Sequence, residues 1–598
     1  MALGFCVAAS RSRRLREEES LNPSARNTES SDRAQPTSAP CSLATPSIRC
    51  PAPQRFLPHA QTLAHSSPPV PVRRRRGGHG NPGPARPHGP LHGGAVAGPG
   101  HEPAISRRRH AHRALPRPLR PPEQPVSHHA ALSALPALGG GADRIGALPD
   151  ALLRDIVSRL PVKDAARTAA LSRRWRGVWR SAPLVLVDAH LFPPARGDAA
   201  SLHAARADGR GVASAVSRVL DAHPGPVRYA HLTSSHMEAF PGLLERWLRT
   251  LAVKGVRHLV LVNRPWPLNM DLPATFFGMA TLTSLFLGLW KFPDTAGLPR
   301  AAAFPHLQEL GLFCMGIENW DMDFVLARSP VLRSLCIQAN ILLRRLSLVS
   351  RSLRCVQIIE GMELEIAVED APQLERLIMW SSSARDGLPR NVKIGHAPAL
   401  TILGYLDPKW HVLQVGNTII KAGTRASPST MVSSVQILSL RVCFGVRNDA
   451  KMLPSFLRCF PNVVRLHIES RKTDEPTGKL NMKFWQEVGA IECIQSHIKL
   501  MIFRDFRGDR SELAFLKFFL ESARVLRRLV IVFGKGSFTS TAEMNSKVKP
   551  LFTAKRASQT CSILLIESAL EGEEKWFLNF RTGSDFSVRD PFAFIPRD

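Results

Sequence analysis

Residues 143–181 read DRIGALPDALLRDIVSRLPVKDAARTAALSRRWRGVWRS, and this stretch indicates how the middle of the chain folds. Its apolar residues recur at helical spacing in three short runs, which Pro161 and Ser172 separate. Pro149 suits a helix start, and Pro161 ends the helix that follows it. We therefore expect three short amphipathic helices. A segment below about 40 residues rarely buries enough surface to be stable alone, so we expect it to dock on a partner.

The three expected helices differ in their side chains. The first carries a broad apolar stripe, formed by Leu152, Leu153, Ile156, Val157 and Leu160. The second, from about Val162, is rich in alanine and has Asp164 in its first turn, where the helix dipole favours negative charge. In the third, Trp175 and Trp179 share a face because they are four residues apart. Such a pair is typical of interface anchors, and a small core helix with a solvated basic face is the alternative.

The order of these residues also carries a family resemblance. Two Leu-Pro pairs, apolar residues at helical spacing between them, and Leu-Ser-x-x-Trp-x-x-x-Trp at the end resemble an F-box. The resemblance implies that the helices insert into a Skp-family adaptor, which links to a cullin scaffold and the RING subunit of a ubiquitin ligase. The residues expected to bind the adaptor are Leu148, Pro149, Leu152, Ile156, Leu160, Pro161, Val162, Leu171, Ser172, Trp175 and Trp179.

A strand signature of the form L-x-x-L-x-L, or a close variant, recurs through the 300 residues that follow. Its central residues are Leu259, Leu285, Leu310, Leu335, Val356, Leu377, Leu403, Leu438 and Leu466. Successive instances are 26, 25, 25, 21, 21, 26, 35 and 28 positions apart. Leucine-rich repeats have a period of about 20 to 29 residues, and each unit needs a neighbour to bury its apolar edge. We expect an irregular solenoid of parallel strands with helix or loop returns, and hence an α/β fold.

The region from residue 493 to 533 predicts one more repeat. We expect a strand from Ile498 to Phe503, a turn at residues 507–509, a helix from about Ser511, and a strand from Leu529 to Phe533. This region resembles the FBD region that follows the leucine-rich repeats of many plant F-box proteins. Beyond it, residues 535–549 suggest a polar loop and residues 562–567 a final strand.

Composition separates the ends of the chain from its middle. Residues 1–142 contain no Lys and carry 19 Arg against 7 acidic residues, which predicts a disordered tail. The runs at 73–76 and 107–109 fit a nuclear-localisation or nucleic-acid patch, or simply a solvated leader. The expected division is a disordered tail at 1–142, an F-box at 143–187, degenerate repeats at 188–485, an FBD-like repeat at 486–535 and an extension at 536–598.

Several classes of site are not indicated by the sequence. The ten cysteines form no C-x-x-C pair, which disfavours a zinc module, and no phosphate-binding or nucleophile motif occurs. We expect no cofactor, no bound metal and no catalytic residue. No apolar run reaches the roughly 18 residues of a membrane span, so we expect an intracellular protein of the nucleus, the cytoplasm or both.

Together these features predict a substrate-recognition subunit of a Skp-cullin-F-box (SCF) ubiquitin ligase, which promotes ubiquitin transfer by proximity. The alternative is a basic nucleic-acid-binding protein or a scaffold outside any ligase, because the chain has a net charge of +30. If the leucines point inward, alternate residues line the concave face, with Phe313 and Trp380 as exposed aromatic anchors. The candidate substrate contacts are Glu309, Phe313, Arg376, Trp380, Arg441, Arg465, His467 and Glu469. Ordinary solvated surface is the alternative for each of them.

Overall fold

A computed structural model describes part of the chain. The described residues are 143–191, 209–233, 240–263, 270–299, 301–340, 342–361, 363–380, 388–473, 476, 478, 481–534, 536–568 and 583–593. They belong to one compact unit. The tail predicted at residues 1–142 lies outside the described residues.

Three helices form where the first stretch predicts them, at α2 (Asp150–Ser158), α3 (Val162–Thr168) and α4 (Arg173–Ser181). Pro149 and Pro161 directly precede α2 and α3, and both adopt an extended backbone that turns the chain into the helix. The Ser172 hydroxyl accepts a hydrogen bond of 3.3 Å from the Trp175 backbone N–H, which caps α4. The three-helix prediction is therefore confirmed.

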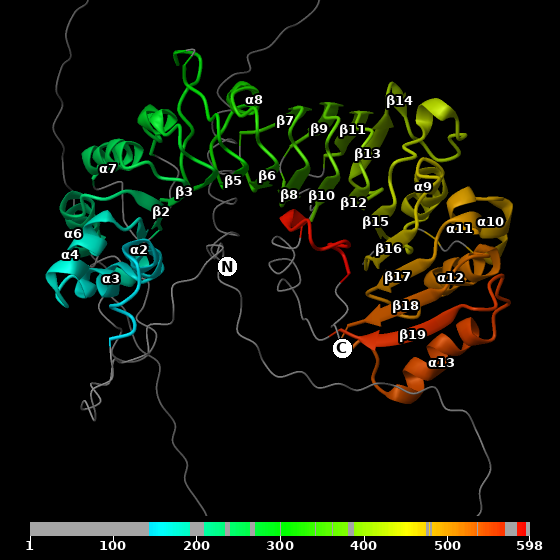
Figure 1. Cartoon of the computed structure of the whole chain (residues 1–598). Helices are drawn as coiled ribbons and strands as arrows, with labels where there is room; N and C mark the ends of the chain where they lie inside the picture. The colour runs from blue at the N-terminus through cyan, green and yellow to red at the C-terminus, as the bar shows by residue number, and fades with distance from the viewer. Residues whose placement is uncertain are drawn as a thin grey trace, which may run out of the picture. The chain divides into compact units, whose positions relative to one another are not determined.

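A parallel sheet of fourteen strands follows the helices (Figure 1). Its strands, in spatial order, are β1 (Leu184–Val187), β2 (Val227–Leu232), β3 (His258–Val262), β4 (Ser284–Gly288), β5 (Glu309–Phe313), β6 (Ser334–Gln338), β8 (Cys355–Ile359), β10 (Arg376–Met379), β12 (Ile402–Leu406), β15 (Ile437–Val442), β16 (Arg465–Ser470), β17 (Leu500–Arg504), β18 (Arg528–Phe533) and β19 (Ser562–Glu567). Every strand that the repeat signature predicts is present. Strands β1 and β2 have no such signature and were not predicted.

The segments that return from one strand to the next lie on one side of this sheet (Figure 1). The helical returns are η1 (Asp188–Leu191), α6 (Gly209–Ala222), α7 (Pro241–Val253), η3 (Ala274–Gly278), α8 (Asn319–Ala327), η4 (Pro428–Thr430), α9 (Arg447–Arg458), α10 (Met482–Glu487), α11 (Glu492–Ser496), α12 (Arg510–Ser522) and α13 (Thr541–Phe552). In the middle, β7 (Arg345–Val349), β9 (Glu365–Asp370), β11 (Arg390–His396), β13 (His411–Val415) and β14 (Thr418–Ile419) form a second sheet instead. The two shortest repeats fall here, because a 21-residue unit leaves little room for a helical return.

The signature leucines face the returns and build one continuous core. Leu285, Leu310 and Leu335 pair in register on β4, β5 and β6, and all three are buried. Val162 of the first helical region lies in this same core, and the ring of Trp179 lies 4.6 Å from that of His223. The three helices are therefore not an isolated plug, because the first repeats already cover part of their apolar surface.

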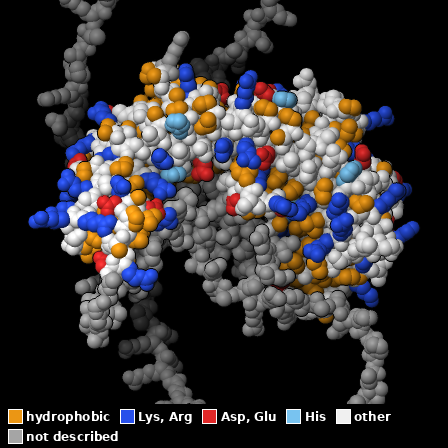
Figure 2. Space-filling model, in the orientation of Figure 1, with side chains coloured by type: hydrophobic (Ala, Val, Ile, Leu, Met, Phe, Trp, Pro, Cys, Tyr) orange, Lys and Arg blue, Asp and Glu red, His pale blue; other side chains and the backbone are white. Residues whose placement is uncertain are grey.

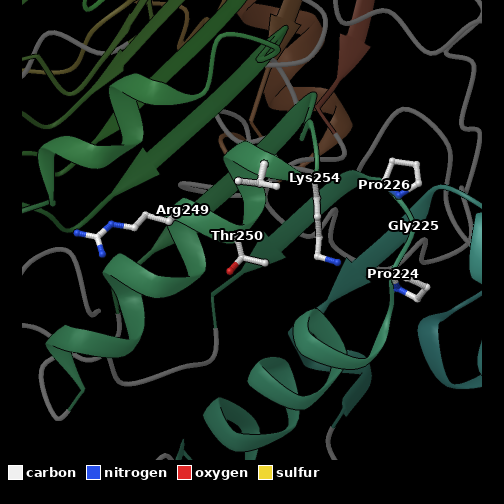
Figure 3. Close-up of a pocket in the computed structure, with 7 residues that line it drawn as sticks. Pro224, Gly225, Pro226, Arg249, Thr250 and Lys254 are labelled. Carbon is white, nitrogen blue, oxygen red and sulfur yellow. The ribbon is translucent and has the colours of Figure 1, made fainter.

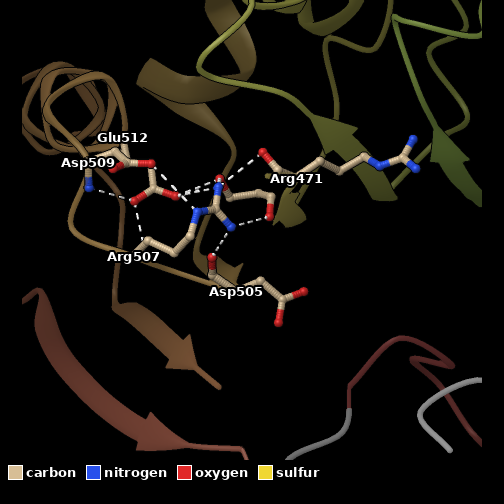
Figure 4. A network of polar contacts seen from close by, with 6 residues as sticks. Arg471, Asp505, Arg507, Asp509 and Glu512 are labelled. Atoms are coloured by element: carbon tan, nitrogen blue, oxygen red, sulfur yellow. Dashed lines mark hydrogen bonds and ion pairs between the residues drawn. The ribbon is translucent and has the colours of Figure 1, made fainter. Parts of the chain in front are cut away.

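A buried polar network fixes the start of α12 (Figure 4). The Glu512 carboxylate is fully buried and accepts hydrogen bonds from the backbone N–H groups of Arg507 and Asp509, both at 3.0 Å. It also accepts one of 2.6 Å from the Ser470 hydroxyl. The Arg507 guanidinium donates to the Ser470 and Arg471 carbonyls, both at 3.0 Å. This network ties the repeat at 486–535 to β16, and it is structural.

The expectation of a polar loop at residues 535–549 is wrong. Helix α13 occupies most of this region, and its buried residues Met544, Val548 and Leu551 recur at helical spacing. The Ser540 hydroxyl caps the helix by accepting a hydrogen bond of 3.1 Å from the Glu543 N–H. The many polar residues between the apolar ones mask this period in the sequence. The final strand expected at 562–567 is confirmed as β19.

Candidate functional site

The apolar stripe of α2 divides into two rows. Leu153 and Val157 are buried and form a small core with Ala165 and Val178. Leu152 and Ile156 point away from this core and expose 52% and 40% of their surface. The helix thus has one apolar row for its own fold and a second that the described protein leaves uncovered.

Two more large apolar side chains of the helical region are exposed. Leu171, just before α4, is 67% exposed, and Ile145 before α2 is 60% exposed. Figure 2 shows hydrophobic side chains at the surface of these helices with Lys and Arg side chains around them. Arg174 donates to Asp150 at 2.8 Å and to the Leu148 carbonyl at 2.5 Å, which fixes the start of α2 against α4. An apolar surface with a polar rim is the usual composition of a protein interface.

The predicted adaptor-binding residues fall into three groups by exposure. The exposed ones are Pro149, Leu152, Ile156, Leu171 and Ser172; the half-buried ones are Leu148, Leu160, Trp175 and Trp179; the buried ones are Pro161 and Val162. Val162 packs in the repeat core, so its side chain is not at the surface. Adaptor binding by this set stays a prediction. Ile145 belongs to the same surface, although the sequence pattern did not single it out.

A pocket of about 480 Å³ lies between the turn before β2 and the end of α7 (Figure 3). Pro224, Gly225 and Pro226 line one side, and Arg249 and Lys254 are among the residues of the other. The Lys254 ammonium donates to the His223 carbonyl. The lining holds no carboxylate, thiol or imidazole, and its polar side chains are those of Arg249, Thr250 and Lys254.

Two of the predicted substrate contacts lie apart from the rest, on β5. Glu309 is exposed and accepts a hydrogen bond of 3.2 Å from Ser284. Phe313 is half-buried and lies over Gly288, where a Cβ atom would overlap its ring. Phe313 packs on an apolar patch that includes Val262 and Phe286. Substrate contact by these two residues stays a prediction.

The other six candidates lie further along the same concave face, the side of the fourteen-stranded sheet that is turned away from the helices. Arg376, Trp380, Arg441 and His467 are buried, whereas Arg465 and Glu469 are half-buried. The expectation of an exposed Trp380 is wrong. Residues 583–593, here called the C-terminal segment, cover part of this face and account for much of the burial (Figure 1).

Polar contacts between strands also hold these side chains. The Arg441 guanidinium donates to the Glu469 carboxylate at 3.0 Å and to the Trp380 carbonyl at 2.7 Å. Its charge lies 4.5 Å from the centroid of the Tyr405 ring. The Trp380 indole N–H donates to Gln357 at 2.8 Å. Arg441 therefore links three strands of the face, and this role is structural whether or not a substrate binds there.

Asp590 of the C-terminal segment makes an acidic contact with the concave face. Its carboxylate is 3.1 Å from Arg465 and 3.1 Å from the His467 ring. Burial alone raises the pKa of Asp590, but the charges and hydrogen bonds of His467 and Arg465 outweigh it and lower the pKa to about 2. The carboxylate is thus held ionised. No local pattern in the sequence indicates this contact, because the partners are more than a hundred residues apart.

The described residues offer neither a metal site nor a membrane span. No three His, Cys, Asp or Glu side chains among them are close enough to hold a metal ion. The seven cysteines of the described part of the chain are all buried, and none of them forms a disulfide. No helix there combines the length and the hydrophobicity that a bilayer crossing requires.

Three known domain families match separate parts of the chain. The F-box domain matches residues 145–186, the LRR repeats of the FBD-associated F-box protein At5g56370 match residues 244–468, and the FBD matches residues 486–531. The F-box/FBD/LRR-repeat protein At5g22660 of Arabidopsis thaliana is 23% identical over 71% of this chain and 97% of that relative. The putative F-box/FBD/LRR-repeat protein At5g44950 of the same species is 24% identical over 71% of this chain and 100% of that relative.

Proposed function

Because the chain is an F-box protein with leucine-rich repeats and an FBD region, we propose that it is the substrate-recognition subunit of an SCF-type ubiquitin ligase. Its F-box binds a Skp-family adaptor, which connects it to a cullin and a RING subunit. Its repeats bind the protein to be modified. The chain contributes proximity rather than catalytic groups of its own.

The observation that carries the proposal is the exposed row of Leu152 and Ile156, together with the exposed Leu171. When a partner covers exposed apolar side chains, the free energy of the complex falls by about 25 cal/mol per Å² of apolar surface buried. Leu153 and Val157 pack within the F-box, so covering the outer row leaves its own core in place. This division fits an F-box that is folded in the free chain and whose outer apolar row is covered by the adaptor.

Two finer points belong to the same proposal, namely the bounds of the domains and the compartment in which the protein acts. We place the F-box at 143–187, the degenerate repeats at 188–485, the FBD-like repeat at 486–535 and the extension at 536–598. The protein acts in the nucleus, the cytoplasm or both.

A basic nucleic-acid-binding role stays the alternative, and it predicts that adaptor capture fails while nuclease treatment releases the bound partners.

The test is co-purification of the full chain with a Skp-family adaptor and its cullin. Ile156→Asp should abolish capture, because the complex would bury an unpaired carboxylate at a cost of several kcal/mol. The matched control is Val253→Asp, which places the same charge on an apolar residue of α7 that is 89% exposed and outside the F-box. Capture that survives Ile156→Asp as well as it survives Val253→Asp would contradict the proposal.

A further inference from the structure

The C-terminal segment is held largely through its backbone. The Arg376 guanidinium donates to the carbonyls of Gly583, Asp585 and Val588 at 2.9, 3.0 and 2.9 Å. The Arg504 guanidinium donates to the Phe592 carbonyl at 2.8 Å. Such contacts do not depend on which side chains the segment carries. The segment is folded into turns, with the Val588 N–H donating to the Asp585 carbonyl at 3.0 Å. The face can therefore hold any turn-forming chain whose carbonyls reach the same positions.

Two side chains of the segment make selective contacts. The Asp590 carboxylate lies between Arg465 and His467. The Phe592 ring is fully buried, with its centroid 5.8 Å from Trp380, 5.1 Å from Tyr405 and 5.5 Å from His467. Edge-on packing of this kind is the favoured arrangement of aromatic rings. The Phe592 N–H donates to Asp590 at 3.1 Å, which fixes the carboxylate and the ring relative to each other.

A third side chain of the segment that contacts the sheet is Phe586, near the segment's N-terminal end. The Phe586 ring has the Arg354 guanidinium at 4.0 Å and the Arg376 guanidinium at 4.8 Å from its centroid. The residues around it, Asp585, Ser587 and Arg589, are exposed. The segment thus turns one set of side chains to the sheet and the other to solvent, as a bound peptide does.

The repeats supply the matching charge. Arg376, Arg465 and Arg504 come from β10, β16 and β17, and Arg354 directly precedes β8. The segment crosses these strands and joins neither sheet as a strand. A row of guanidinium groups over several strands suits a peptide ligand with carbonyl acceptors along its length and at least one carboxylate.

We propose that the concave face between β8 and β17 is a binding site for an acidic, turn-forming segment of another protein. That segment carries an aromatic residue two positions after a carboxylate, and residues 583–593 occupy the site in the free chain. This inference rests on the proposed function, since the substrate supplies the competing segment. A substrate binds by replacing the C-terminal segment, so recognition and release of the segment are coupled.

The experiment measures binding of a labelled synthetic peptide, GSDFSVRDPFA, to the full chain by fluorescence anisotropy. In the wild type the chain's own segment competes with the peptide. Asp590→Asn combined with Phe592→Ala weakens that competitor, so we expect this variant to bind the peptide at least tenfold more tightly. A peptide with the same two substitutions should lose at least tenfold in affinity for the variant.

The matched control is Arg589→Ala, which changes an exposed residue of the same segment and should bind the peptide as the wild type does. Equal affinity of the wild type and the double variant, or equal affinity of both peptides, overturns the inference. If circular dichroism shows that the double variant is unfolded, Asp590→Asn alone is measured, with at least threefold tighter binding expected and no change overturning it.

This test is independent of the F-box. The peptide assay contains no adaptor, and capture of the adaptor needs no peptide. Loss of the peptide effect with adaptor capture intact removes the inference alone. Loss of adaptor capture with the peptide effect intact removes the proposed function and leaves a peptide-binding repeat protein.

Discussion

The outer face of the F-box and the concave face of the repeats are two candidate interfaces of opposite character. The first is apolar and exposed, through Leu152, Ile156 and Leu171. The second is rich in arginine, and the chain covers part of it with its own residues 583–593. A small apolar patch can stay exposed to water in the free protein. A face lined by hydrogen-bond donors binds selectively, because a partner without matching acceptors would leave those donors buried and unsatisfied. We infer that the F-box face suits a constant partner and the concave face an exchangeable one.

The largest effect should come from breaking the apolar face. Leu152→Asp combined with Ile156→Asp should weaken adaptor binding about a thousandfold, or about 4 kcal/mol, because two carboxylates would be desolvated without partners. Thermal stability should stay near that of the wild type, since both positions are exposed. Calorimetric titration with the purified adaptor measures the first quantity, and a thermal melt measures the second.

Leu153→Ala provides the control for this pair. Leu153 adjoins Leu152 in sequence but is fully buried, so its loss should lower the free energy of unfolding of the F-box by about 3 kcal/mol. Adaptor affinity of the folded fraction should change little. If the melts of the two variants were indistinguishable, the division of α2 into an inner and an outer row would be refuted.

The two faces also differ in how well the sequence predicts them. A helical period in residues 143–181 identifies α2 to α4, because the residues that pack together are three or four positions apart. The period alone does not separate Leu152 from Leu153, since both lie within one broad stripe. That separation depends on α3 and α4, which cover only part of the stripe.

For the concave face, the sequence predicts which side chains share the face but not which of them are buried. Alternation along each strand places Arg465, His467 and Glu469 on one side of β16, as predicted. Their burial depends on Asp590 and Phe592, which lie more than a hundred residues away in a segment without a repeat signature. The second sheet was missed for a related reason, since β7 and β9 replace helices where two repeats are short. Contacts of this range leave no local period in the sequence.

Phe592→Ala should have the next largest effect, on the concave face. Removing a fully buried aromatic ring costs about 3 kcal/mol, here mainly in the free energy of docking the C-terminal segment. Amide hydrogen exchange near Phe592, in residues 589–593, should then accelerate about a hundredfold, while exchange in β15 and β16 stays slow. Exchange that accelerates equally in the strands would mean that the segment is an inseparable part of the repeat fold.

Asp590→Asn should have a smaller effect that depends on pH. The pKa of Asp590 is lowered from 3.8 to about 2 in the docked state, which corresponds to roughly 2 kcal/mol of docking free energy. Because the pKa is lowered by docking, this contribution is fully present above pH 3.8 and is lost as the pH falls through 2. Arg465 and His467 are the charged and titratable groups that face the carboxylate.

The measurement for Asp590→Asn is the exchange rate of the segment at two pH values. The variant should exchange faster than the wild type at pH 6, and the ratio of the two rates should narrow as the pH falls below 4. A ratio that stays constant down to pH 3 would contradict a charged Asp590 contact.

The smallest effect should follow from Arg354→Ala. Its guanidinium lies over the half-buried Phe586 ring, and a partly exposed cation–π contact contributes about 0.5 to 1 kcal/mol. Arg354 also pairs with Glu375 at 2.7 Å, but both side chains are about one-third exposed, so this ion pair adds little. Exchange should therefore accelerate about three- to fivefold at residues 583–588 and remain unchanged at residues 590–592. Uniform acceleration along the segment would instead show that it detaches as one unit, and that Asp590 and Phe592 do not hold its far end independently.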